Sequence, residues 1–108
     1  MSALRAAGLA LLAALALAAQ AGEAADVALG RKVFSEIAQP PCAACHTLKA
    51  AGAAGTVGPS LDELKPDKGR ALNALRNGVG IMPSFADKLT REQIEAVAAF
   101  VAQVSGGE

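Results

Sequence analysis

The stretch Cys42-Ala43-Ala44-Cys45-His46 reads C-x-x-C-H, and it decides how the rest of the chain is interpreted. This spacing is typical of covalent c-type haem attachment, because two thiols one helical turn apart can each add to one vinyl group of a haem. The histidine that follows is then carried under the iron as its proximal ligand. The motif is more specific in this chain because His46 is the only histidine and Cys42 and Cys45 are the only cysteines.

Three other interpretations of the motif are weaker. A thioredoxin-type dithiol needs a βαβ run with strands rich in Val and Ile, and no such strand precedes Cys42. A structural zinc site usually needs four ligands, so an acidic residue or a second chain would have to complete the set offered here. A disulfide across so short a loop is strained and removes little entropy from the unfolded chain.

The amino-terminal segment has the layout of a secretory signal peptide. A positive charge at Arg5 is followed by the apolar run Ala6–Ala19 and by the small-x-small site Ala19-Gln20-Ala21. The apolar run is shorter than the roughly 18 residues expected of a membrane span. We expect residues 1–21 to be removed on export to the periplasm, with no stable membrane insertion afterwards. Cleavage a few residues later, or an uncleaved anchor, is the alternative.

Residues 22–108 are long enough for one domain and no more. Without Arg5 this part has nine basic and ten acidic residues, a formal charge of −1. Nucleic-acid binding is not expected, because there is no basic stripe and phenylalanine is the only aromatic residue type. A domain this small often needs a covalent link or a cofactor to be stable, and a covalently bound haem provides one. A monomer is the expected state.

Three helices and no strand are predicted, which makes the fold class all-α. The first runs from Asp26, which can cap its amino end, to Ile37, and Gln39-Pro40-Pro41 ends it. Residues 66–77 form the second. The third follows the capping box Thr90-Arg91-Glu92-Gln93, shows apolar residues at helical spacing, and closes at Gly106-Gly107.

Two loops separate these helices. Residues 50–58 are almost all Ala and Gly, and we expect most of them to form a flexible surface connection. Residues 78–85 contain Met82, the only methionine once Met1 has left with the leader. Methionine more often fills gaps in a core than binds a metal. On the residues alone, the sixth ligand of the iron is therefore Met82, a lysine amine or nothing.

The motifs taken in order resemble those of the class I bacterial monohaem cytochromes c. They are Cys42-Ala43-Ala44-Cys45-His46, Gly58-Pro59-Ser60-Leu61, Gly80-Ile81-Met82-Pro83 and a closing amphipathic helix. The resemblance spans essentially the whole mature chain and implies a cytochrome c domain over residues 22–108, with three main helices around one haem. It also places Gly30 and Phe34 where the first helix crosses the last, facing Phe100.

The resemblance assigns a role to each site residue. The two cysteines would hold one haem c through thioether bonds, and His46 and Met82 would be the proximal and distal ligands of its iron. Pro59 would accept a hydrogen bond from the other imidazole nitrogen of His46, which orients the ring. Leu61 would pack on the haem.

The chain departs from these relatives near the haem propionates. Many relatives have a tryptophan or tyrosine there, and this chain contains neither residue type. The sequence leaves seven polar or basic replacements open: Lys65, Lys68, Arg70, Asn73, Arg76, Asn77 and Ser84.

The implied function is electron transfer without an enzymatic reaction. An iron ligated by both His46 and Met82 has no open position for a substrate, so its work would be outer-sphere one-electron transfer by a periplasmic carrier. A thioether ligand raises the potential relative to two nitrogen ligands. Two alternatives are a cytochrome subunit of a periplasmic dehydrogenase complex and a haem-based ligand sensor in which a small molecule displaces Met82.

The expected partners are redox proteins, a donor dehydrogenase and a terminal oxidase or reductase. They would dock over the loop of residues 78–85 through a small transient interface. Val79, Ile81, Pro83 and Phe85 are the expected apolar contacts, with Lys88 and Arg91 nearby to steer association.

Overall fold

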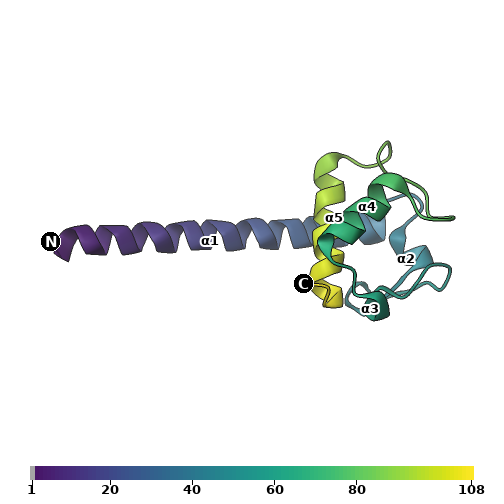
Figure 1. The fold of residues 1–108 in the computed structure, drawn as a ribbon, viewed down its shortest axis with the longest axis horizontal. Helices are drawn as coiled ribbons and strands as arrows, with labels where there is room; N and C mark the ends of the chain where they lie inside the picture. The colour runs from purple at the N-terminus through teal and green to yellow at the C-terminus, as the bar shows by residue number, and fades with distance from the viewer. Residues whose placement is uncertain (1) are drawn as a thin grey trace.

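A single long helix, α1 (Ser2–Lys32), begins the chain in the computed structural model. The structure describes residues 2–108, and side chains at 10–17, 22 and 26–108. The amino-terminal part of α1 extends away from all other elements (Figure 1). The helix continues into a π-helical turn, Val33–Ile37, in which the Ala38 N–H donates to the Val33 carbonyl at 3.0 Å.

The predicted amino end of the first helix is therefore wrong, and its carboxyl end at Ile37 is confirmed. Alanine and leucine are strong helix formers, and no proline occurs before Asp26, which lies inside α1. The cleavage near Ala21 stays a prediction.

The two other long helices are α4 (Lys68–Asn77) and α5 (Arg91–Ser105). Helix α4 begins two residues later than predicted because the Asp67 carboxylate caps it, accepting the Arg70 N–H at 2.7 Å. The capping box of α5 is confirmed: Thr90 and Gln93 each accept the other's backbone N–H, at 3.1 and 2.9 Å.

Short elements that periodicity does not reveal fill the region between these helices. They are α2 (Cys42–Cys45), β1 (Thr47–Leu48), a 3-10 turn (Lys49–Ala51), β2 (Ala53–Ala54) and α3 (Leu61–Leu64). Strands β1 and β2 pair antiparallel, with Thr47 opposite Ala54. The expectation of no strand is wrong at these residues, since residues 50–58, expected to be a surface connection, contain β2 and the end of the 3-10 turn. The described residues outside the strands form helices and the loops that connect them, and the predicted cytochrome c type of fold is confirmed.

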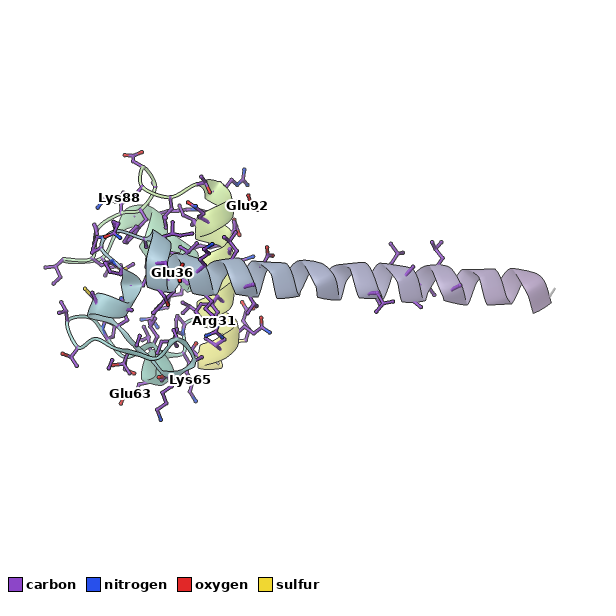
Figure 2. The ribbon with its side chains drawn as sticks, turned by 180° about the vertical axis from the view of Figure 1, so that it is seen from behind. Arg31, Glu36, Glu63, Lys65, Lys88 and Glu92 are labelled. Atoms are coloured by element: carbon purple, nitrogen blue, oxygen red, sulfur yellow. The ribbon has the colours of Figure 1, made fainter. Side chains whose placement is uncertain are left out.

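Helices α1 and α5 cross at close range, and this contact anchors the core. A Cβ built on Gly30 would stand only 2.5 Å from the Cβ of Phe100, so only glycine permits the observed approach. The Phe34 and Phe100 rings are both buried and meet edge to face, with their centroids 6.0 Å apart. Arg31 covers the crossing (Figure 2), with its guanidinium 5.0 Å from the centre of the Phe100 ring. The predicted contact of Gly30 and Phe34 with Phe100 is thus confirmed.

Candidate haem-binding site

A cavity of about 470 Å³ lies among α2, α3, α4 and α5. Helices α2, α3 and α4 lie on the side of the molecule away from the free end of α1 (Figure 1). This volume falls in the range of about 300–1,000 Å³ typical of cofactor sites. Every site residue proposed from the sequence lines it: Cys42, Cys45, His46, Pro59, Leu61 and Met82. These residues come from three separate segments of the chain and meet at one apolar wall.

The two thiols are held one turn apart by α2. Pro41 precedes the helix in an extended conformation, and the Ala44 N–H donates to its carbonyl at 3.1 Å. The His46 N–H donates to the Cys42 carbonyl at 3.0 Å, which closes the turn. His46 follows the helix with extended backbone angles and lines the cavity together with the two cysteines. The motif thus presents two sulfurs and an imidazole to the same cavity.

The orientation of His46 is set by the loop that follows β2. Its Nδ1 lies 2.8 Å from the Pro59 carbonyl oxygen. A carbonyl can only accept, so Nδ1 is the donor in this contact. In the neutral imidazole with this tautomer, Nε2 holds the lone pair that a metal requires. Gly58 makes this approach possible, because a Cβ there would come within 2.6 Å of the His46 Cε1. The Gly58 N–H also donates to the Cys45 carbonyl at 2.7 Å, which ties the loop to α2.

Met82 reaches the cavity from a tight turn. The backbone groups of Val79 and Met82 exchange hydrogen bonds of 3.1 and 2.9 Å, and Gly78 and Gly80 adopt positive φ values of 73° and 57°. L-residues with a side chain rarely adopt such angles, so these glycines let the chain reverse there. The Phe85 N–H donates to the Leu75 carbonyl at 2.7 Å and anchors the turn to α4. Met82 is half-buried, with its thioether side chain at the cavity.

The pKa of Cys42 disfavours a redox dithiol. Burial raises the pKa of the Cys42 thiol from 9.0 to about 11, and the neighbouring Cys45 adds to the rise. A thioredoxin-type nucleophile needs the opposite shift. Helix, not strand, precedes Cys42, and the two thiols are free and not joined as a disulfide. Among the residues that the structure describes, no group of three or more His, Cys, Asp or Glu side chains could hold a metal ion such as zinc.

Several cavity residues were not identified as site residues from the sequence. They include Phe34, Leu75, Phe85, Val97 and Val101, all buried. Their signal in the sequence is only that of core residues at helical spacing, which does not distinguish a wall around a cofactor from a packed core. The expectation that Phe85 offers a docking contact is wrong, because its side chain is 3% exposed.

The donor set fits a haem. Two thiols on one helical turn, an imidazole with a free Nε2 and a thioether share one apolar cavity of cofactor size. With the mainly helical fold, this site defines a small class I monohaem cytochrome. The family described as "Cytochrome C oxidase, cbb3-type, subunit III" matches residues 25–101. The chain belongs to the c-type cytochromes.

Similar proteins agree with this assignment. The chain is 38% identical over 97 residues to "Cytochrome c6, chloroplastic" of Chlamydomonas reinhardtii, covering 81% of this chain and 60% of that protein's length. It is 35% identical over 86 residues to cytochrome c6 of Bryopsis maxima, covering 70% of this chain and 89% of that one. The crystal structure of the c-type cytochrome SorU from Sinorhizobium meliloti superposes with a TM-score of 0.72 at 54% identity, covering 75% of this chain and 92% of that one.

Membership of this family establishes the prosthetic group and the general role. The protein carries covalently attached haem c with its iron, and it takes part in electron transport. Its only two cysteines, Cys42 and Cys45, are the residues available for the thioether bonds.

Proposed function

We propose that the protein is a periplasmic one-electron carrier whose haem iron is ligated by His46 and Met82. The observation that carries this proposal is that the only imidazole and the only thioether after the leader line one cavity. His46 directly follows α2, and the loop that orients it is tied to α2 by the Gly58 N–H. Met82 lies in a separate turn, which the Phe85 N–H ties to α4. Two side chains held independently in this way would each supply one ligand to the iron of a bound haem.

The residues of the chain bind the haem, orient the His46 ring and exclude water from the cavity. Haem c supplies an iron that cycles between Fe(III) and Fe(II). Pro59 holds the His46 ring at 2.8 Å, so that Nε2 need not reorient when the charge changes. Buried side chains such as Leu61 and Leu75 remove water from the cavity, which disfavours the extra positive charge of Fe(III). A thioether acts in the same direction, so a positive potential is expected.

The rim of the cavity supports docking of redox partners. Val57, Val79 and Ile81 all line the cavity and are 62%, 62% and 85% exposed. Exposed apolar side chains at the edge of a cofactor suit a transient interface, in which a donor or acceptor approaches without lasting association. Lys88 lies beside this rim, with its amine 5.6 Å from the centre of the buried Phe85 ring, and can steer an acidic partner.

The free part of α1 supports export and cleavage. Leu11, Leu12, Leu15 and Leu17 are 60–66% exposed on a helix that extends away from the other elements (Figure 1). Such an apolar surface is expected on a segment that acts in targeting and is then removed. Within the part of the chain that the structure describes, no helix is long and apolar enough to cross a membrane.

Carbon monoxide binding to the reduced holoprotein tests the ligation and separates a carrier from a ligand sensor. The wild type should bind none while folded, because Met82 occupies the sixth position. The Met82→Ala variant should bind it readily. The matched control Ile81→Ala truncates the adjacent, 85% exposed side chain and should not bind carbon monoxide. Binding of carbon monoxide by the folded wild type would favour the sensor. A Met82→Ala variant that binds no carbon monoxide would show that Met82 is not a ligand of the iron.

A further inference from the structure

A haem c carries two propionate carboxylates, and the structure narrows the candidates for their partner. A carboxylate at the edge of an apolar cavity must remain in water or pair with a donor, since burying an unpaired charge is very costly. The sequence leaves seven polar or basic side chains open for this role. The cavity wall and the hydrogen bonds of each candidate decide among them.

Arg70 is the only one of the seven that lines the cavity. It is also the only formally charged side chain in the wall, which otherwise consists of apolar residues, the cysteines and His46. Arg70 is exposed, so it lies at the rim, where a carboxylate attached to a largely buried ring would emerge. Its position in the first turn of α4 is set by the Asp67 cap on its backbone N–H.

Most of the other candidates have partners elsewhere. The Lys68 amine and the Arg76 guanidinium both pair with Glu95 on α5, at 3.2 and 3.1 Å. The remaining polar pairs are equally local: Asn77 donates to the Asn73 side chain at 2.7 Å, and the Ser84 hydroxyl donates to the Arg76 carbonyl at 2.6 Å.

Lys65 lies at the outer edge of the molecule (Figure 2) and does not line the cavity. The Arg70 side chain, by contrast, makes no ion pair or side-chain hydrogen bond within the described residues. Arg70 is therefore the one candidate that both reaches the cavity and keeps all its side-chain donors available.

We propose that the Arg70 guanidinium pairs with a haem propionate and helps to position the haem and set its potential. The planar fork of an arginine matches the two oxygens of a carboxylate, which a lysine amine cannot do. A fixed positive charge beside the propionate offsets its negative charge and so favours Fe(II) over Fe(III). The inference rests on the covalent haem c and not on the proposed distal ligand, so it can fail while the carrier function stands.

The test measures the reduction potential of exported holoprotein for four variants. Arg70→Gln removes the charge and the fork, and Arg70→Lys keeps the charge. Lys65→Gln and Arg91→Gln remove an equal charge from exposed side chains that do not line the cavity. Arg70→Gln should lower the potential, changing the oxidised-to-reduced ratio at fixed poise by about three- to tenfold, as expected for one partly screened charge. Arg70→Lys should restore part of the shift, and both controls should move it far less.

A second readout detects the pairing itself. In the nuclear magnetic resonance spectrum of the reduced wild type, the Arg70 Nε–H should exchange slowly with solvent, unlike that of the exposed Arg91. An Arg70→Gln potential equal to that of Arg91→Gln would overturn the proposal. So would a larger shift for Lys65→Gln, or rapid exchange of the Arg70 Nε–H. If Arg70→Gln yields too little holoprotein, the exchange measurement on the wild type still decides.

Discussion

Replacing Gly30 by alanine tests the crossing of α1 and α5, on which the cavity wall depends. The new Cβ would stand 2.5 Å from the Phe100 Cβ and would also overlap the Ala96 carbonyl. Carbon atoms pack at about 3.5–4.0 Å, so the helices must move apart by about 1 Å or more. Neither neighbour is the end of a flexible side chain, and local adjustment therefore cannot relieve the overlap.

The expected loss of stability is about 2 kcal/mol. Overpacking of a core costs about 1–3 kcal/mol, with the upper end appropriate to a clash against backbone. The better helix propensity of alanine returns up to about 1 kcal/mol. For a domain of this size, a loss of 2 kcal/mol lowers the midpoint of thermal unfolding by roughly 10 °C.

The assay is thermal unfolding of the oxidised holoprotein followed by circular dichroism. The control is Gly69→Ala in the first turn of α4, where the new Cβ would make only an ordinary contact, 3.5 Å from Asp67. Its midpoint should stay the same or rise slightly. If Gly30→Ala unfolds at or above the wild-type temperature, the close crossing is not a constraint and the reasoning is refuted.

Three further changes probe the cap of α5, the proximal loop and the thiols. Thr90→Ala should destabilise the holoprotein by about 1 kcal/mol in urea unfolding, because it removes the cap on α5; an unchanged midpoint would contradict this. Gly58→Ala should lower the thermal midpoint by roughly 4–8 °C, since its Cβ would meet the His46 ring 2.6 Å away and break a hydrogen bond worth about 1 kcal/mol; a wild-type midpoint would argue against the tight loop. In the chain before haem attachment, with Cys45→Ala, alkylation of Cys42 should accelerate only above pH 9, because burial, the largest cause of the raised pKa, remains; acceleration already complete near pH 9 would contradict the burial of this thiol.

The raised pKa of Cys42 also predicts that the chain without haem loses stability in alkali. Burial raises the pKa of this thiol above its unfolded value of 9.0, so the folded chain keeps the proton that the unfolded chain loses. The contribution is fully present below pH 9 and is lost as the pH rises through about 11. Because haem attachment converts the thiol to a thioether, the holoprotein should lack this dependence.

Features with a local chemical cause could be predicted from the sequence. The capping box at Thr90 specifies the start of α5, and the prolines after Gln39 account for the end of the π-helical turn. The C-x-x-C-H, G-P-S-L and G-I-M-P motifs identified side chains that meet at one cavity, although nothing in their spacing along the chain shows how these three segments converge.

Other features could not be predicted from the sequence, because they depend on tertiary contacts or because the elements are too short to show a periodic pattern. Helices α2 and α3 have four residues each, and the strands have two, so none shows a repeat. The start of the first helix was wrong because propensity alone continues α1 through the leader. The choice of Arg70 over six other polar side chains required the cavity wall and the ion pairs of Glu95, which link α4 to α5.

The most direct test of the central claim is an absorption spectrum of the exported holoprotein, first oxidised and then reduced. Ligation by His46 and Met82 predicts the sharp bands of a low-spin, thioether-linked haem on reduction. It also predicts a weak red band of sulfur-to-iron charge transfer in the oxidised protein, absent from Met82→Ala. An oxidised spectrum without that band, or one that Met82→Ala leaves unchanged, would contradict the account.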